Sequence, residues 1–317
     1  MDLLKFSVRK LVGGIPLILG VSFISFLLMV YFGPDISGYF LGKNPTAEQI
    51  ASVRAQLGYD KPFLVRYVDY LKELVTLDFG ESLSSGEVVS SKLGKAIPVT
   101  LALMAPGFVL GNLLGLGLAL VAAYYRGRWL DKLIMGASVV GMSISFLIVV
   151  IFFQLVFCSS QGLNWFPSRG WEVYSFASYL YYVTVPTLAV VFVALGYNTR
   201  FYRAILVEEL GRDHVRTARA YGTGPAKLLY RNVLKNSLIP IVTRVMFSIP
   251  LVVVSGSLII ESYFGIPGVG KITYDAITLG DQPVLKAVVG MTAVLFVITL
   301  LLTDILYRVV DPRVELS

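Results

Sequence analysis

The chain has 317 residues, of which 56% are hydrophobic and 15% are charged, and its net charge is +7. Soluble domains carry roughly 25% charged residues, so this composition excludes an ordinary soluble enzyme and indicates a membrane protein. The basic excess lies beside the apolar segments, as expected for the cytoplasmic face of a membrane protein. No nucleic-acid partner is needed to explain it.

Six segments are long and apolar enough to cross a membrane. A helix needs about 20 mostly apolar residues to span a hydrocarbon core of roughly 30 Å. Stretches without Asp, Glu, Lys or Arg cover residues 11–34, 96–125, 133–168, 173–199, 245–260 and 287–303. The first stretch is too long for the apolar core of a signal peptide, and no small-residue cleavage site follows it. We therefore predict an all-α membrane protein with six transmembrane helices, near residues 10–32, 98–123, 133–157, 177–199, 238–261 and 284–307.

The basic residues of the short connections predict the orientation of these helices. The segment 200–244 alone holds nine Lys and Arg residues, whereas the connections after the third and fifth helices hold one and two. We therefore expect both termini and the loop 200–240 to be cytoplasmic. The loop 33–95 is then extracytoplasmic, and the whole chain, 1–317, forms a single transmembrane domain.

The extracytoplasmic loop 33–95 is patterned rather than a plain linker. Three short helices are expected in it, at 47–57, 62–76 and 87–95. Thr46 and Gln49 form a capping box for the first, which Gly58 can end, and Pro62 suits the first turn of the second. Two interpretations remain open: a lid packed on the outer surface of the bundle, or a docking site for an external partner.

The cytoplasmic loop 200–240 contains two helix signals. Asp213 is a suitable N-cap for a short polar helix over 214–221, and Gly222 can end it. Pro225 then begins a second helix with a basic stripe, which suits the phosphates of the inner membrane surface. The stripe consists of Lys227, Arg231 and Lys235. The short helix has too little apolar area to pack by itself, so we expect a groove on a partner protein to hold it.

The stretch SYFGIPGVGKIT (262–273) looks like a phosphate-binding loop, but two features argue against that function. Gly265, Gly270 and Lys271 match G-x-x-x-x-G-K, yet the Ser or Thr that should follow is Ile272. The segment also joins two membrane helices on the outer face, away from cytoplasmic ATP. We predict a tight turn there.

Polar residues inside membrane helices are costly, and they either line a path or hold helices together. Asn112, Ser143, Ser145 and Gln154 are the candidates for a translocation path. Helix packing is the alternative for each of them. No charged residue lies near the centre of a predicted span, which argues against a secondary transporter driven by protons or sodium.

The chain shows no pattern of catalytic or metal-binding residues. His214 is the single histidine, and no metal-ligand cluster and no nucleophile with a neighbouring base accompanies it. His214 is therefore expected at a partner surface rather than in catalysis. We predict that the chain is not an enzyme.

One motif set resembles a known family. DHVRTARAYGTGPAKLLYRNVLKNSLIP (213–240) resembles the cytoplasmic coupling loop of ABC importer permeases, in particular the first (B-type) transmembrane subunit of the dipeptide/oligopeptide/nickel class. His214 stands where that family usually has an aromatic residue, and Tyr221 stands where it usually has lysine. Four other stretches agree, in the same order: LDFGESL (77–83), IPVTLAL (97–103), ESYFGIPGVG (261–270) and DPRV (311–314).

This resemblance implies a type I ABC importer permease in the bacterial cytoplasmic (inner) membrane. Its partners would be a second permease subunit in a heterodimer, two ATPase subunits, an extracytoplasmic substrate-binding protein and membrane lipids. ATP and magnesium would be bound by the ATPases, so this chain would hold no cofactor. Its coupling residues would be Glu208, Asp213, His214, Arg216, Thr217, Ala218 and Gly222.

The resemblance also implies a substrate class. Di- or oligopeptides are expected, while nickel, glutathione or another small solute remains an alternative within the same architecture. An ion-coupled secondary transporter and a membrane anchor without a transport role are the alternatives from other classes.

Overall fold

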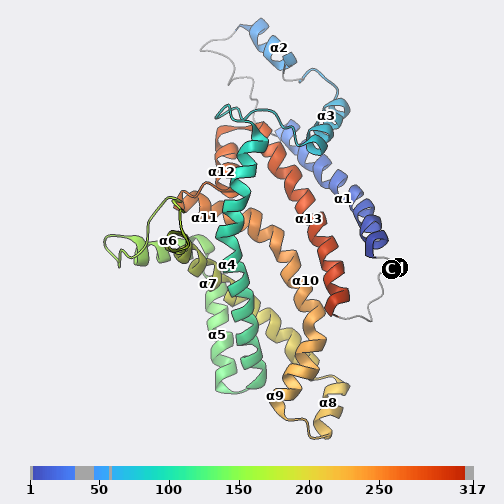
Figure 1. Cartoon of the computed structure of the whole chain (residues 1–317), viewed down its shortest axis with the longest axis vertical. Coiled ribbons are helices and arrows are strands. Elements are labelled where there is room, and N and C mark those ends of the chain that lie inside the picture. Colours follow the sequence, from blue (N-terminus) through green and yellow to red (C-terminus); the bar gives the residue numbers. More distant parts are fainter. Residues whose placement is uncertain (1–2, 33–45, 57–58, 311–317) are drawn as a thin grey trace.

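The computed structural model describes residues 3–32, 46–56 and 59–310, and the elements in these ranges are helices (Figure 1). This confirms the predicted all-α class. The predicted helix end at Gly58 and the terminal DPRV (311–314) lie outside the described residues.

Five helical segments are long and apolar enough to cross a membrane, and a bent pair can supply a sixth. The five are α1 (Leu3–Phe32), α4 (Val89–Tyr124), α7 (Phe176–Leu210), the continuous segment Pro225–Phe264 and α13 (Gln282–Val310). Each includes one of the predicted spans, and each extends beyond it at one end or both. Helical turns that include polar residues extend these helices beyond their apolar stretches. Hydropathy alone therefore underestimates the length of the helices.

The third predicted span, 133–157, is not one straight helix. It consists of α5 (Trp129–Ser143) and α6 (Phe146–Cys158), which are bent by 96° to one another. Ile144 has an extended backbone (φ −88°, ψ 130°), and the Ser143 hydroxyl donates to the Val139 carbonyl (2.9 Å). Serine side chains compete with the helical backbone for hydrogen bonds in this way, and an apolar pattern does not reveal where such a break falls.

The short helices of the connections lie at two opposite ends of the molecule (Figure 1). Figure 1 shows α8 (Asp213–Ala220) and α9 (Pro225–Lys227) at one end of the molecule. Helices α2 (Ala47–Gln56), α3 (Phe63–Thr76) and α12 (Val269–Leu279) lie toward the other (Figure 1). Helix α13 runs toward the end where α8 lies, while α1 runs away from it (Figure 1). The start of α1 and the end of α13 therefore face the same side as the loop around α8.

The centre of the bundle is the contact between α4 and α7. Glycines on one face of α4 allow this close approach: a Cβ on Gly111 would lie 2.7 Å from the Ala194 Cβ of α7. Asn112 on α4 accepts a hydrogen bond from the Asn198 amide of α7 (3.2 Å). Small residues and a polar pair fasten these two helices, as is common in membrane bundles.

The outer loop differs from the prediction in its details. Helix α2 (Ala47–Gln56) begins with the predicted capping box, in which Thr46 and Gln49 exchange both hydrogen bonds (2.9 and 3.3 Å). Helix α3 (Phe63–Thr76) begins after Pro62, which lies before its first turn instead of within it. The expected elbow helix at 87–95 is not separate, because α4 runs without interruption from Val89.

The last outer connection contains a helix that was not predicted. After α10 (Lys235–Leu251) and α11 (Ser257–Phe264), a short turn leads into α12 (Val269–Leu279), which precedes α13. Two π-helical segments, Leu228–Leu234 and Val252–Gly256, lie directly before and directly after α10. The expected tight turn exists, but it occupies only the first part of this connection.

Candidate functional site

The short polar helix α8 forms close to the predicted position. The N-cap is Arg212 rather than Asp213, which is the first helical residue and makes no side-chain cap. An acidic residue in the first turn still favours the helix dipole. Gly222 has a left-handed backbone (φ 79°), and its N–H donates to the Arg219 carbonyl (3.0 Å), so it ends the helix as predicted.

One apolar residue anchors α8 to the rest of the chain. Val215 is completely buried, and Ala218 packs against the same cluster. The cluster joins four elements through Ala119, Ala123, Tyr202, Leu206, Leu228, Leu229, Val233 and Ile241. Val215 was missed as an anchor, although it is the single large aliphatic residue between Asp213 and Tyr221. Because Val215 faces inward, it decides which face of α8 is exposed.

The opposite face of α8 is free of contacts with the described chain. The side chains of Asp213 and Arg216 are 96% and 72% exposed and pair at 3.5 Å. Thr217, Ala220 and the adjacent Tyr221 are exposed on the same side. Of the predicted coupling residues, Asp213, Arg216 and Thr217 therefore point outward, whereas Ala218 points inward.

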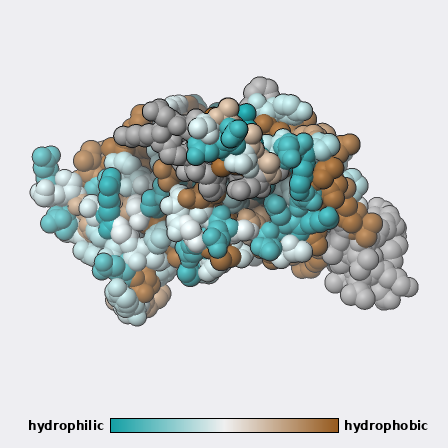
Figure 2. Space-filling model, turned by 90° about the horizontal axis from the view of Figure 1, so that it is seen from above, coloured by the Kyte–Doolittle hydropathy of each residue, from teal (hydrophilic) through white to brown (hydrophobic). Residues whose placement is uncertain are grey.

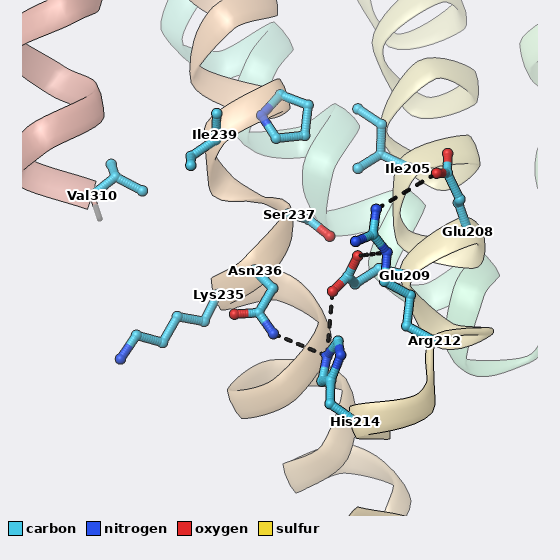
Figure 3. A pocket seen from close by; sticks show the side chains of 11 residues that line it. Ile205, Glu208, Glu209, Arg212, His214, Lys235, Asn236, Ser237, Ile239 and Val310 are labelled. Carbon is cyan, nitrogen blue, oxygen red and sulfur yellow. Dashed lines mark hydrogen bonds and ion pairs between the residues drawn. The ribbon is translucent and has the colours of Figure 1, made fainter. Parts of the chain in front are cut away.

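Beneath α8, a polar network joins the end of α7 to the start of α10 (Figure 3). Glu209 is buried and pairs with Arg212 Nε at 2.9 Å and with His214 Nε2 at 3.3 Å. The Asn236 amide nitrogen lies 3.0 Å from the same His214 nitrogen. That nitrogen can accept from Asn236 when bare or donate to Glu209 when protonated. The imidazole thus contacts groups of its own chain and is still 41% exposed, so a partner contact at His214 stays a prediction.

A hollow of about 770 Å³ opens beside this network. Figure 3 shows its walls, which come from α7, α8, α10 and the end of α13. Glu208 lies on its rim, 3.8 Å from Arg212. Among the described residues, no group of His, Cys, Asp or Glu side chains is arranged to hold a metal ion.

The four candidate path residues lie in three different places. Asn112 accepts from Asn198 and from the Tyr202 hydroxyl, so it binds α4 to α7. Ser143 and Ser145 lie at the corner between α5 and α6. Gln154 on α6 donates to the Ser168 carbonyl (2.7 Å). The structure gives each of them a local hydrogen-bonding or capping position and does not gather them.

At the opposite end of the molecule, Glu261 on α11 holds a junction that was not singled out. Its side chain is completely buried. The Thr100 hydroxyl of α4 donates to one carboxylate oxygen (2.6 Å), and the Lys271 backbone N–H donates to the other (3.0 Å). Thr100 in turn accepts from the Val269 N–H (2.8 Å). Side chains of α4 and α11 thereby satisfy two of the free N–H groups at the start of α12.

The turn before α12 packs its glycines against α11. Gly265 has a left-handed backbone (φ 68°), and the Ile266 N–H donates to the Glu261 carbonyl (2.9 Å), which ends α11 in a Schellman-type arrangement. A Cβ on Gly270 would lie 2.4 Å from the Leu258 backbone nitrogen. The glycines serve close packing between α11 and α12, in agreement with the rejection of a phosphate-binding loop.

Comparison with known proteins gives one consistent result. Residues 111–316 match the model of the family described as binding-protein-dependent transport system inner membrane component, and residues 3–104 match the model of its N-terminal region. A putative peptide transport system permease protein of Brucella abortus (strain 2308) is 30% identical over 309 residues, which cover 97% of this chain and 98% of that protein. A glutathione transport system permease protein of Salmonella typhimurium (strain LT2) is 30% identical over 313 residues, which cover 99% of both chains.

Proposed function

The chain belongs to the binding-protein-dependent transport system inner membrane components, and from this premise we propose that it imports di- or oligopeptides. The family membership makes it a non-catalytic, multi-pass inner-membrane permease of an ABC importer, without a cofactor of its own. Such a permease works with ATPase subunits and a binding protein. An ion-coupled secondary transporter and a passive membrane anchor are therefore no longer alternatives.

The names of two relatives support the peptide proposal. One is a putative peptide permease and the other a glutathione permease, and glutathione is itself a short peptide. Both cover nearly the whole of this chain at the same identity, so neither is favoured over the other. Glutathione, nickel or another small solute is the alternative substrate within the same architecture.

The outward face of α8 is proposed as the surface that an ATPase subunit holds. The observation that carries this proposal is the division of α8 into two faces, with Val215 buried and Asp213, Arg216 and Thr217 free. Movement of α8 would pass to α7 and α10 through Val215 and through the pairs of Glu209 and His214. A second permease subunit would complete the path, and two ATPases would act on the pair.

Uptake measurements in vesicles containing the whole complex test this docking face. The Thr217→Trp variant places a bulky ring on the outward face and is expected to abolish peptide uptake while the chain remains inserted. Lys132→Trp, on an exposed residue in the first turn of α5, is the matched control and is expected to transport normally. Normal uptake by Thr217→Trp would contradict the proposed docking face.

The substrate is tested separately with the binding protein that copurifies with the complex. Binding of short peptides, and competition among peptides, glutathione and nickel for uptake, are measured with the same vesicles. Uptake of peptides alone supports the proposal. Uptake of nickel or glutathione to the exclusion of other peptides would move the chain to the alternative substrate.

A further inference from the structure

Helix α3 has one face packed against two membrane-crossing helices. The Tyr67 hydroxyl donates to the Leu19 carbonyl of α1 (2.9 Å), and the Tyr70 hydroxyl donates to the Lys286 carbonyl of α13 (3.3 Å). A Cβ on Gly290 of α13 would lie 2.4 Å from the Leu74 side chain. An aromatic cluster completes the contact, made of Phe23, Phe26, Tyr31, Phe63, Tyr67 and Tyr70.

A second face of α3 is apolar and exposed. Leu64, Val68, Leu71 and Val75 follow one another at spacings of four, three and four residues, and this places them in one stripe along the helix. Leu64 and Val75 are 67% and 83% exposed. An aliphatic stripe of this length, left uncovered, is unusual for a helix surrounded by water.

The third face of α3 is charged. Lys61 pairs with Asp69 at 3.2 Å, Lys72 lies 3.7 Å from Asp69, and Glu73 lies 3.5 Å from Lys286. The Asp69 carboxyl has a pKa below its usual range because Lys61 donates a hydrogen bond to it. The charges thus lie on one side of the helix, which also carries the exposed Val65, and the four-residue aliphatic stripe lies on another. A charged side beside an apolar one is typical of a helix at a membrane surface.

The contacts of α3 place it beside the membrane-crossing part of the chain. Its ring contacts and hydrogen bonds with α1 lie between Leu19 and Tyr31, and the apolar span of α1 is Val12–Tyr31. Seen from the end where α2 and α3 lie, hydrophilic residues cover much of the surface, and hydrophobic ones lie toward its left-hand edge and also along its right-hand edge (Figure 2). The right-hand edge is the side on which α1 and α3 lie in Figure 1.

We infer that the stripe Leu64–Val68–Leu71–Val75 is embedded in the outer leaflet of the membrane, with the charged face of α3 toward the headgroups and water. Helix α3 is then packed on the bundle with its stripe in lipid, and it is not a docking site for an external partner, the second interpretation that the sequence left open. A lipid surface fits the stripe because acyl chains match its aliphatic side chains, and headgroups match the neighbouring pairs of opposite charge. This inference does not depend on the substrate.

The test uses nitroxide labels on the complete transporter in vesicles of phosphatidylethanolamine and phosphatidylglycerol. Cys158 is the single cysteine of the chain and is buried; it is replaced by alanine, as are the cysteines of the partner subunits. Single cysteines for labelling are then introduced by Val68→Cys and Val75→Cys. Lys72→Cys on the charged side of the same helix is the matched control. Copurification of the ATPase subunits confirms that each labelled complex is assembled.

Collision rates with molecular oxygen and with a water-soluble nickel chelate report the surroundings of each label. Labels at positions 68 and 75 are expected to collide several-fold more with oxygen, which concentrates in lipid, than with the chelate. The label at position 72 is expected to show the reverse preference. The inference is overturned if the labels at 68 and 75 collide freely with the chelate, which would place the stripe in water. It is also overturned if both reagents are excluded, which would show that another protein covers it.

Discussion

The two ends of this permease each contain a buried carboxylate where helices meet, but the carboxylates are satisfied differently. Glu209, beneath α8, is held by an ion pair with Arg212 and by a contact with His214, and the side chains of both partners are substantially exposed. Glu261, at the outer end, is held by a hydroxyl and a backbone N–H, and among the described residues it forms no ion pair. The inner junction lies at the edge of water, and the outer junction is dry.

The different partners of the two carboxylates indicate which junction can rearrange. A partly solvated ion pair is worth little, because water competes for both groups. A buried donor that loses its acceptor costs about 1–3 kcal/mol, because no water replaces the bond. The outer junction of α4, α11 and α12 is therefore expected to stay rigid. The inner junction of α7, α8 and α10 suits a part that moves with the ATPases.

The largest effect is expected from Glu261→Ala. This change leaves the Thr100 hydroxyl and the Lys271 N–H without their acceptor, at about 1–3 kcal/mol for each buried group. Thermal unfolding of the purified complex should show a clear fall in Tm. Glu208→Ala, at an exposed carboxylate on the inner end, is the control and should leave Tm unchanged. An unaltered Tm for Glu261→Ala would show that Glu261 does not stabilise the outer junction.

A smaller loss is expected from Gly270→Ala, which tests how closely α12 packs on α11. The new methyl would lie 2.4 Å from the Leu258 backbone nitrogen, and overpacking of this kind costs about 1–3 kcal/mol. Gly117→Ala on α4 is the matched control, because nothing lies within 4 Å of its Cβ position. Tm is measured for both variants. Equal values would show that the contact between α11 and α12 can accept the added methyl group without loss of stability.

His214→Ala is expected to affect coupling more than stability. It removes contacts with Glu209 and Asn236 at the base of α8, while Val215 still anchors the helix. The amount of ATP hydrolysed per peptide imported should rise, with Tm nearly constant. Lys235→Ala, in the wall of the same hollow, serves as the control. A fall in Tm with an unchanged ratio of ATP hydrolysed to peptide imported would show that the inner network stabilises the fold, like the outer junction, and does not serve coupling.

The smallest effect is a dependence of stability on pH at Asp281, in the turn between α12 and α13. Burial opposes its ionisation, but hydrogen bonds from Ser82 and Ser84 outweigh that effect and hold the Asp281 pKa below its usual range. The stabilisation is therefore present above the ordinary Asp pKa of about 3.9 and lost as the pH falls below it. Asp281→Asn should flatten the acidic part of the profile of Tm against pH. A profile identical to that of the unmodified protein would show that Asp281 does not cause this pH dependence.

Local signals in the sequence predicted the features that depend on neighbouring residues. The capping box of Thr46 and Gln49, the helix end at Gly222 and the turn at Gly265 all rest on backbone groups within a few residues. The apolar runs predicted the membrane helices for the same reason, since burial in lipid requires little more than length and composition. The motif at 213–240 likewise indicated where α8 lies in the chain.

Features that depend on distant residues were missed or misplaced. The break at Ile144 has no periodic signal of its own, and the amphipathic helix α12 begins within the segment predicted as a turn between membrane helices. Thr100 and Glu261 are 161 positions apart in the chain, so their pairing cannot be read from either segment alone. The expected partner contact of His214 stays a prediction, and only the fold shows that this side chain also lies against Glu209 and Asn236.

The sequence by itself determined that this protein is an all-helical membrane permease, where most of its spans lie and which short helix protrudes from it. These properties follow from local composition and from motifs that sit within single segments. Only the tertiary structure decided which face of α8 is free, which polar residues join helices and which carboxylate is sealed from water. Those properties depend on the packing of segments far apart in the chain, and Val215 and Glu261 acquire their roles only when α4, α7, α10 and α11 come together.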